Sequence, residues 1–210
     1  PSIVAGGANA CVLHYIDNRD RLRKGDLLLI DAGAELDCYC ADITRTFPIN
    51  GRFSATQKAL YDIVLAAQLA AIDAVKPGAT FNEPHEAAVR VISTGLKDLK
   101  LLKGSVDGLI EKGAYQKFFV HRTSHWLGLD VHDVGEYRLG DAWRVLEAGM
   151  VLTVEPGIYV PAEKSVPKKW QGIGIRIEDD VLVTRAGHEV LTDDAPKHPE
   201  AIEDLMASGD

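Results

Sequence analysis

The chain has 210 residues, with 23 Lys and Arg against 31 Asp and Glu, and a formal net charge of -8. This length accommodates one large domain or two small ones, with a substantial core. The acidic balance argues against nonspecific nucleic-acid binding and adhesion to anionic membranes, and no run of about 18 apolar residues predicts a transmembrane helix.

The first part of the chain carries strand signals and then a helix signal. The apolar run Leu27–Ile30 lies between turn-forming residues and predicts a buried strand, and a second extended segment follows at 39–47. Ser54 with Gln57 three residues later is a capping box. We therefore expect a helix from this point to the stop signal Pro77-Gly78.

Two further helices and four strands are expected after it. The second helix, capped by Asn82 with Pro84 in its first turn, should end near Gly104, and a shorter one should span 106–112. The remaining pattern predicts strands over 118–124, 150–155, 173–178 and 181–184. This order indicates an α+β fold with helices on one face of a sheet, and no boundary divides residues 1–210.

Four carboxylates lie on predicted strands, where burial is costly: Asp31, Asp42, Glu155 and Glu178. A buried carboxylate needs a cation or hydrogen bonds to offset its desolvation. Each one alone has a simpler explanation as a turn residue, a loop residue or, for Glu178, a surface ion pair with Arg176. Four together favour a shared cation site. Because strand side chains alternate, Arg176 and Glu178 should project together, opposite the isoleucines of 173–177.

Three of the seven histidines fall within twelve residues: His121, His125 and His132. In a continuous strand the first two share a face and His132 takes the other. Gly128 permits a turn that would bring His132 back toward them. For the histidines at 85, 188 and 198 a structural role is favoured.

One histidine with four carboxylates is an oxygen-rich set that suits Mn²⁺, Mg²⁺ or Zn²⁺. Two divalent ions would balance the four carboxylates, and a pair about 3.5–4 Å apart can hold a bridging hydroxide. The residues by themselves predict a two-metal hydrolase. A cysteine nucleophile is the rival, because Cys38 and Cys40 would share a strand face, but no cysteine-protease signature surrounds them.

The three cysteines, Cys11, Cys38 and Cys40, lack CxxC spacing. A sparse, odd count gives no disulfide framework, so we expect a reducing, cytoplasmic compartment. The chain begins at Pro1 without the basic and apolar regions of a signal peptide. We expect it to be a piece of a longer protein.

Five stretches together resemble aminopeptidase P, the Xaa-Pro aminopeptidase branch of the pita-bread metallopeptidases. The stretches are 31–33 (DAG), 42–48 (DITRTFP), 124–133 (SHWLGLDVHD), 153–157 (TVEPG) and 174–180 (GIRIEDD), and the resemblance covers essentially the whole chain in order. The resemblance implies an α/β (α+β) pita-bread fold, a curved antiparallel sheet with helices on its outer face. It also implies that residues 1–210 form a catalytic metallopeptidase domain whose N-terminal part is missing.

The resemblance also assigns roles by motif position. It implies two divalent ions, usually Mn²⁺ with Zn²⁺ or Co²⁺ as alternatives, held by five ligands: Asp31, Asp42, His125, Glu155 and Glu178. Asp42 and Glu178 match the bridging carboxylates. The residues near the substrate are matched by His14, His121, His132 and Arg176. A hydroxide bridging the ions would attack the Xaa-Pro bond of peptides with proline in second position, with Glu155 taking its proton and His132 stabilising the oxyanion.

The same resemblance leaves alternatives. A prolidase, which cleaves only Xaa-Pro dipeptides, has the same chemistry, and some relatives are binding modules without activity. Arg122-Thr123 and a loop at 136–144 that is about one residue longer depart from the family pattern. Roughly the first quarter of the pita-bread domain is absent, so we expect a longer native chain or a companion segment. Peptides, not nucleic acids or membranes, are the expected partners, and a homo-oligomer is an expected assembly.

Overall fold

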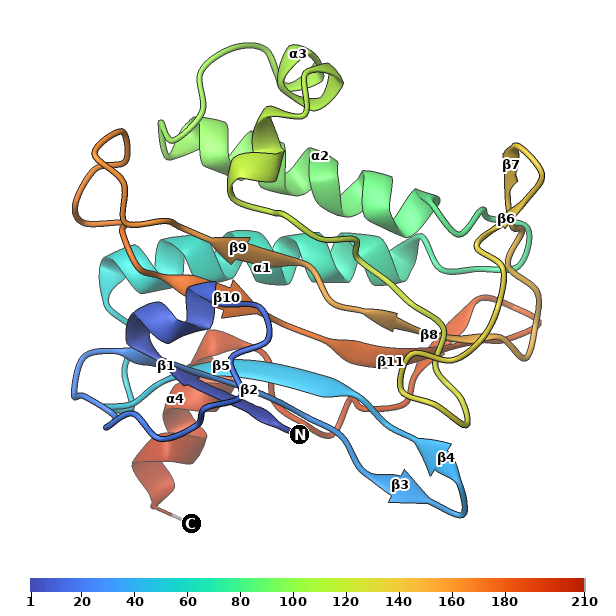
Figure 1. The fold of residues 1–210 in the computed structure, drawn as a ribbon, viewed down its shortest axis with the longest axis horizontal. Coiled ribbons are helices and arrows are strands. Elements are labelled where there is room, and N and C mark those ends of the chain that lie inside the picture. The colour runs from blue at the N-terminus through green and yellow to red at the C-terminus, as the bar shows by residue number, and fades with distance from the viewer. Residues whose placement is uncertain (210) are drawn as a thin grey trace.

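The computed structural model describes residues 1–209, whose frame is two three-stranded antiparallel sheets (Figure 1). The first has the order β1-β2-β5, formed by Ile3–Gly6, Leu27–Ala32 and Ile43–Pro48. The second has the order β12-β11-β8, formed by His188–Val190, Asp179–Val183 and Val151–Val154. A backbone bridge between Thr44 and Glu178 links the two sheets at their junction.

Shorter elements complete the sheet layer. Strand β9 (Gly157–Tyr159) pairs with β10 (Gly174–Arg176), and two small hairpins are formed by β3 (Glu35–Leu36) with β4 (Tyr39–Cys40) and by β6 (Arg138–Leu139) with β7 (Ala142–Trp143). The 3₁₀ helices are η1 (Gly7–Cys11) and η2 (Ala114–Lys117).

Helices cover one side of this layer. They are α1 (Ala55–Asp73), α2 (Glu83–Asp98), α3 (Val106–Glu111) and, near the C-terminus, α4 (Pro199–Ser208). Helix α1 packs against β8, β9 and β10, and α2 packs against α1 (Figure 1). Apolar residues of α1 and α2, such as Leu60 and Ile92, share one buried cluster with Leu152 and Ile175 of the strands. Among residues 1–209, no helix has the length and apolar character to cross a bilayer.

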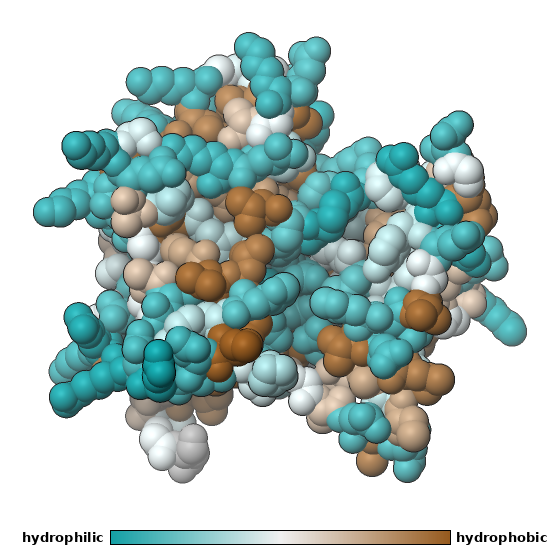
Figure 2. Space-filling view, in the orientation of Figure 1, coloured by the Kyte–Doolittle hydropathy of each residue, from teal (hydrophilic) through white to brown (hydrophobic). Residues whose placement is uncertain are grey.

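The face drawn in Figure 2 carries its apolar side chains in small separate groups among polar ones. Several large apolar side chains of the described chain are nevertheless exposed, including Leu36, Leu129 and Val134. They lie on the β3–β4 hairpin and on the loop that follows His125.

The predicted start of the first helix is confirmed. The Ser54 hydroxyl accepts from the amide of Gln57 at 3.3 Å, and the Gln57 side chain accepts from the amide of Ser54 at 2.9 Å. Pro84 lies in the first turn of α2, as expected. Asn82 stands at the cap position, but its side chain donates to Glu86 and leaves the helix amides uncapped.

We expect Ser54→Ala to lower the free energy of unfolding by about 1 kcal/mol, because it removes a capping-box acceptor. For a chain of this size that corresponds to a fall in Tm of about 2–4 °C. Thermal unfolding by circular dichroism measures the shift. Ser2→Ala, at an exposed position that caps no helix, is the control. Equal Tm values for the two variants would show that the cap contributes nothing.

The predicted strand over 118–124 is wrong. Its backbone makes isolated hydrogen bonds, such as those from Tyr159 to Phe118 and from Glu155 to Thr123, and no ladder. The second helix also ends earlier than expected, at Asp98. Lys100 takes a left-handed conformation (φ 62°), and the amides of the next two residues turn back to the Leu96 carbonyl. Glycine usually takes this conformation at a helix end, so a lysine here could not be recognised as the end of the helix.

Two extended segments are interrupted at the residues of interest. The segment 39–47 divides into β4 and β5, with Asp42 between them, and 173–178 narrows to β10. Residues 177 and 178 then connect β10 to β11, which starts at Asp179 rather than at 181. Cys38 lies in the β3–β4 turn with a φ of 67°, so it does not share a strand face with Cys40.

Candidate metal centre

One pocket collects the residues that the sequence singled out. Its volume is about 330 Å³. Its lining includes all five expected ligands, which are Asp31, Asp42, His125, Glu155 and Glu178. It also includes His14, His121, His132 and Arg176. The nine residues come from segments up to about 160 positions apart, and the fold brings them to one place.

The junction of the two sheets explains this convergence. Asp31 lies near the end of β2, and Asp42 immediately precedes β5, its neighbour in the first sheet. Glu155 follows β8, and Glu178 precedes β11, its neighbour in the second. The bridge from Thr44 to Glu178 holds these strand ends together.

The ring of His125 is oriented with one nitrogen toward the carboxylates. Its Nδ1 lies 2.9 Å from the Trp126 carbonyl, which requires a proton on Nδ1. Its Nε2 is then unprotonated in the neutral ring, 3.5 Å from Asp42 Oδ2 and 3.6 Å from Glu155 Oε1. A histidine held in this way by its other nitrogen is the usual arrangement of a metal ligand.

The carboxylates oppose one another's ionisation. Burial, together with neighbouring Asp42 and Asp31 and against the lowering effect of His125 and Arg176, raises the pKa of Glu155 to about 7. Burial and the carboxylates of Glu155, Asp42 and Asp31 raise the pKa of Glu178 well above its ordinary value. Burial also raises the pKa of Asp31, against the lowering effect of Arg176. Burial would lower the pKa of His125, but its hydrogen bonds and nearby carboxylates produce a net rise.

The donor set fits divalent cations. Asp42, His125 and Glu178 each offer a ligand atom, and these atoms lie within 4.8 Å of one another. Four carboxylates line the pocket with two guanidinium groups, those of Arg122 and Arg176, so the pocket carries excess negative charge. Such charge is stable only when cations or protons compensate it. Carboxylate oxygens with one imidazole are ligands that hard and borderline divalent ions accept.

Arg176 donates hydrogen bonds to several of its neighbours at the pocket. It is buried, and its guanidinium donates to Asp31 at 2.5 Å, to the Tyr159 hydroxyl at 3.0 Å and to Thr44 at 3.2 Å. The surface ion pair with Glu178 is therefore excluded. The carboxylate of Glu178 accepts instead from the Thr44 hydroxyl at 2.6 Å. Arg176 and Glu178 both line the pocket, so they project to the same side as expected.

The remaining histidines surround the carboxylates. His121 lies 2.8 Å from the Tyr159 hydroxyl through Nε2 and 4.0 Å from Glu155 through Nδ1, and burial lowers its pKa to about 4. The ring of His132 packs edge-on against that of His125, with 4.4 Å between the ring centroids. His14 is exposed at the rim of the pocket.

Gly128 lies in the turn between His125 and His132, but the reason for glycine there is not the one expected. Its φ is not in the left-handed region. A Cβ at this position would lie 2.2 Å from a carboxylate oxygen of Asp133. The chain therefore needs glycine here for space, so that the return toward His132 can be tight.

Two residues that hydrogen-bond to the pocket lining had no local sequence signal. Tyr159 contacts both Arg176 and His121, and Thr44 contacts Glu178, yet each is an ordinary strand residue in the sequence. His85 lies outside the pocket and contacts the Thr123 hydroxyl at 2.8 Å, which confirms the structural role favoured for it. The cysteine alternative loses its basis, because Cys38 and Cys40 do not share a strand face and desolvation raises the pKa of Cys40.

Comparisons with known proteins find relatives that match nearly the whole chain. The Xaa-Pro aminopeptidase of Haemophilus influenzae is 53% identical over 205 residues, covering 98% of this chain and 47% of that protein. The Xaa-Pro aminopeptidase of Escherichia coli is 51% identical over 207 residues, covering 99% and 47%. This chain therefore spans about half the length of the curated relatives it matches.

Solved structures give the same result. The aminopeptidase PepP of Pseudomonas aeruginosa superposes with a TM-score of 0.97 at 62% identity, over 99% of this chain and 47% of that one. Variants of Escherichia coli aminopeptidase P superpose with a TM-score of 0.96 at 50% identity. Residues 1–185 match metallopeptidase family M24. The chain has the pita-bread fold of these structures and belongs to metallopeptidase family M24.

Proposed function

We propose that the protein is a Xaa-Pro aminopeptidase, which hydrolyses the bond between an N-terminal residue and a proline in second position. The observation that carries the proposal is the convergence of the nine residues on one pocket. Relatives named Xaa-Pro aminopeptidase match nearly the whole chain at 53% and 51% identity, which supports the same assignment.

We infer that two divalent cations, Mn²⁺ in this branch, are held by five residues: Asp31, Asp42, His125, Glu155 and Glu178. Such a pair, when bound, supplies a hydroxide nucleophile at neutral pH and polarises the scissile carbonyl. Asp42 and Glu178 are the bridging candidates, since the bridge at Thr44 and the short bond from its hydroxyl bring these two carboxylates to the junction of both sheets.

The other pocket residues act on the peptide and its protons. Glu155, between His125 and His121, would accept the proton of the attacking water and pass it to the leaving proline nitrogen. His132 would donate a hydrogen bond to the oxyanion that develops on the scissile carbonyl. His14 and His121 would position the peptide from the rim and the wall, and Arg176 would fix the orientation of Asp31.

We expect His132→Ala to lower kcat about 100-fold while leaving Mn²⁺ content unchanged, because loss of one oxyanion donor typically costs that much. Steady-state kinetics and metal analysis of the same preparation measure both quantities. His198→Ala, at an exposed position outside the pocket, is the control. A His132 variant with unaltered kcat would remove His132 from the reaction.

The test of the substrate class compares a tripeptide Xaa-Pro-Xaa with an Xaa-Pro dipeptide. The proposal predicts release of the N-terminal residue from the tripeptide. Activity confined to the dipeptide would make the protein a prolidase. The intact set of nine residues disfavours an inactive binding module, which would have lost ligands.

Three further points stay predictions. We propose that residues 1–210 act as one catalytic domain and that the protein works in the cytoplasm, which its three free cysteines favour. We also propose a homo-oligomer. Size-exclusion chromatography with light scattering tests the assembly.

A further inference from the structure

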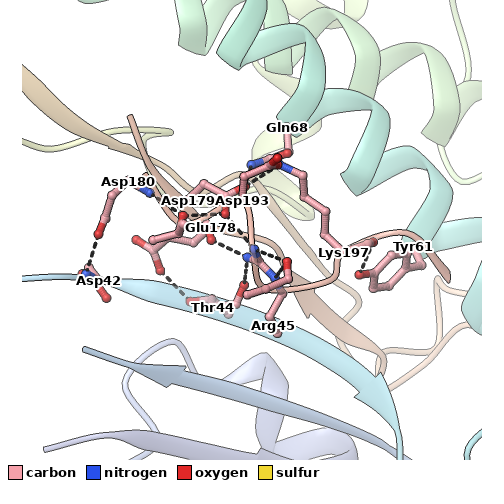
Figure 3. Close-up of polar contacts among 12 residues, drawn as sticks. Asp42, Thr44, Arg45, Tyr61, Gln68, Glu178, Asp179, Asp180, Asp193 and Lys197 are labelled. Atoms are coloured by element: carbon pink, nitrogen blue, oxygen red, sulfur yellow. Dashed lines mark hydrogen bonds and ion pairs between the residues drawn. The ribbon is translucent and has the colours of Figure 1, made fainter. Parts of the chain in front are cut away.

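A buried cluster of charged groups lies beside the metal centre and has no part in the chemistry described so far (Figure 3). At its centre is Asp179, whose side chain is inaccessible to solvent. Its Oδ1 accepts from Arg45 and Thr192, each at 2.7 Å, and its Oδ2 accepts from Gln68 and Lys197, each at 2.6 Å. Two donors on each oxygen saturate the carboxylate.

The cluster ties together four parts of the molecule. Arg45 belongs to β5, Asp179 to β11 and Gln68 to α1, while Lys197 lies in the segment that leads to α4. Arg45 also donates to the carbonyl of Glu178 at 2.6 Å and to that of Thr44 at 3.0 Å. The guanidinium therefore clamps both strands at the point where the two sheets meet.

The two bridging candidates, Asp42 and Glu178, lie within three residues of Arg45 and Asp179 in the sequence. Glu178 directly precedes Asp179, and its amide donates to the Thr44 carbonyl at 3.1 Å. Asp42 lies three residues before Arg45, and its amide donates to Asp180 at 3.1 Å. Glu178 faces the pocket while Asp179 turns toward α1 (Figure 3), as successive side chains in an extended backbone do.

Stability alone does not account for these residues. Two cations and one carboxylate are buried or nearly so, and the cost of desolvating buried ions offsets much of their attraction. Apolar side chains of similar size would hold the same elements together as firmly. Four directional bonds on one carboxylate fix position more narrowly than apolar contacts do.

We propose that Asp179, clamped by Arg45 and Lys197, is a positioning residue that holds Asp42 and Glu178 at the spacing the metal ions require. The inference rests on the metal site proposed above. Outer partners of metal ligands typically contribute 10- to 100-fold to affinity. Two of the hydrogen-bond partners of Asp179, Thr192 and Lys197, lie outside residues 1–185, the range that matches the family.

The test is Mn²⁺ titration of Asp179→Asn by isothermal calorimetry, at a temperature where the variant is folded. Asparagine keeps the shape of the side chain but leaves two buried cations without a counterion. We expect Mn²⁺ affinity to fall about 10- to 100-fold. Lys197→Met removes one cation while Arg45 stays paired, so a smaller fall is expected. If Asp179→Asn fails to fold, the Mn²⁺ affinity of Lys197→Met alone tests the positioning role.

The control is Ile92→Ala, which lowers stability from a buried position in α2 outside the pocket and the cluster. Its Mn²⁺ affinity should equal that of the wild type despite a lower Tm. If the cluster serves stability only, then Asp179→Asn and Lys197→Met should behave like this control. Both would have a lower Tm and a Mn²⁺ affinity within about twofold of the wild type. That outcome overturns the positioning role alone. A wild-type chain that binds no Mn²⁺ overturns the metal site itself.

Discussion

Replacing either bridging candidate, as Asp42→Ala or Glu178→Ala, is expected to abolish Mn²⁺ binding and peptidase activity together. Both carboxylates lie where the two sheets meet, and their oxygens lie within 4.8 Å of each other and of the His125 ring nitrogen. A metal site supplies several kcal/mol of transition-state stabilisation, and about 4 kcal/mol corresponds to roughly 1,000-fold in rate. Activity should therefore fall at least that far.

Metal analysis after dialysis, run beside the assay of Xaa-Pro-Xaa cleavage, checks both parts of this expectation. Asp62→Ala removes an exposed carboxylate that pairs with Lys58 on α1, and it should retain metal and activity. Substantial activity in the Asp42 variant would contradict the two-metal assignment.

Gly33→Ala is expected to damage the fold and the metal centre at once. A Cβ on residue 33 would lie 1.8 Å from the carbonyl oxygen of Ala41, so the backbone itself must move. The two residues stand between Asp31 and Asp42, and displacement there separates these ligands. Overpacking typically costs about 1–3 kcal/mol. We expect the upper end here, a fall in Tm of about 6–12 °C.

Differential scanning calorimetry and Mn²⁺ titration of the variant measure the two consequences. Ala34→Ser, at the next and exposed position, is the matched control and should change neither quantity by much. If Gly33→Ala binds Mn²⁺ as tightly as the wild type, then the close approach of residues 33 and 41 does not set the ligand spacing.

Nine of the residues that line the pocket could be predicted from the sequence, because most ligands lie in a recognisable local pattern. Asp31 ends an apolar run, Glu155 follows another, and the histidines cluster within twelve residues. These patterns reflect strand ends and tight turns, which are local properties of the chain. Their match to known motifs then identified which residues belong together.

What escaped prediction depends on contacts between distant residues. Asp179 is saturated by donors from positions 45, 68, 192 and 197, and nothing near it in the sequence signals that environment. Tyr159 and Thr44 were missed for the same reason. Segment 118–124 has strand-like composition but finds no neighbour with which to form a ladder, and Lys100 ends α2 in a conformation that favours glycine.

Anomalous diffraction from crystals grown with Mn²⁺ tests the central claim most directly. The account predicts two anomalous peaks about 3.5–4 Å apart in the pocket. Their surroundings should be the five expected ligands, Asp31, Asp42, His125, Glu155 and Glu178, with Asp42 and Glu178 between the two ions. No peak at this place, or a single ion held by other residues, would contradict it.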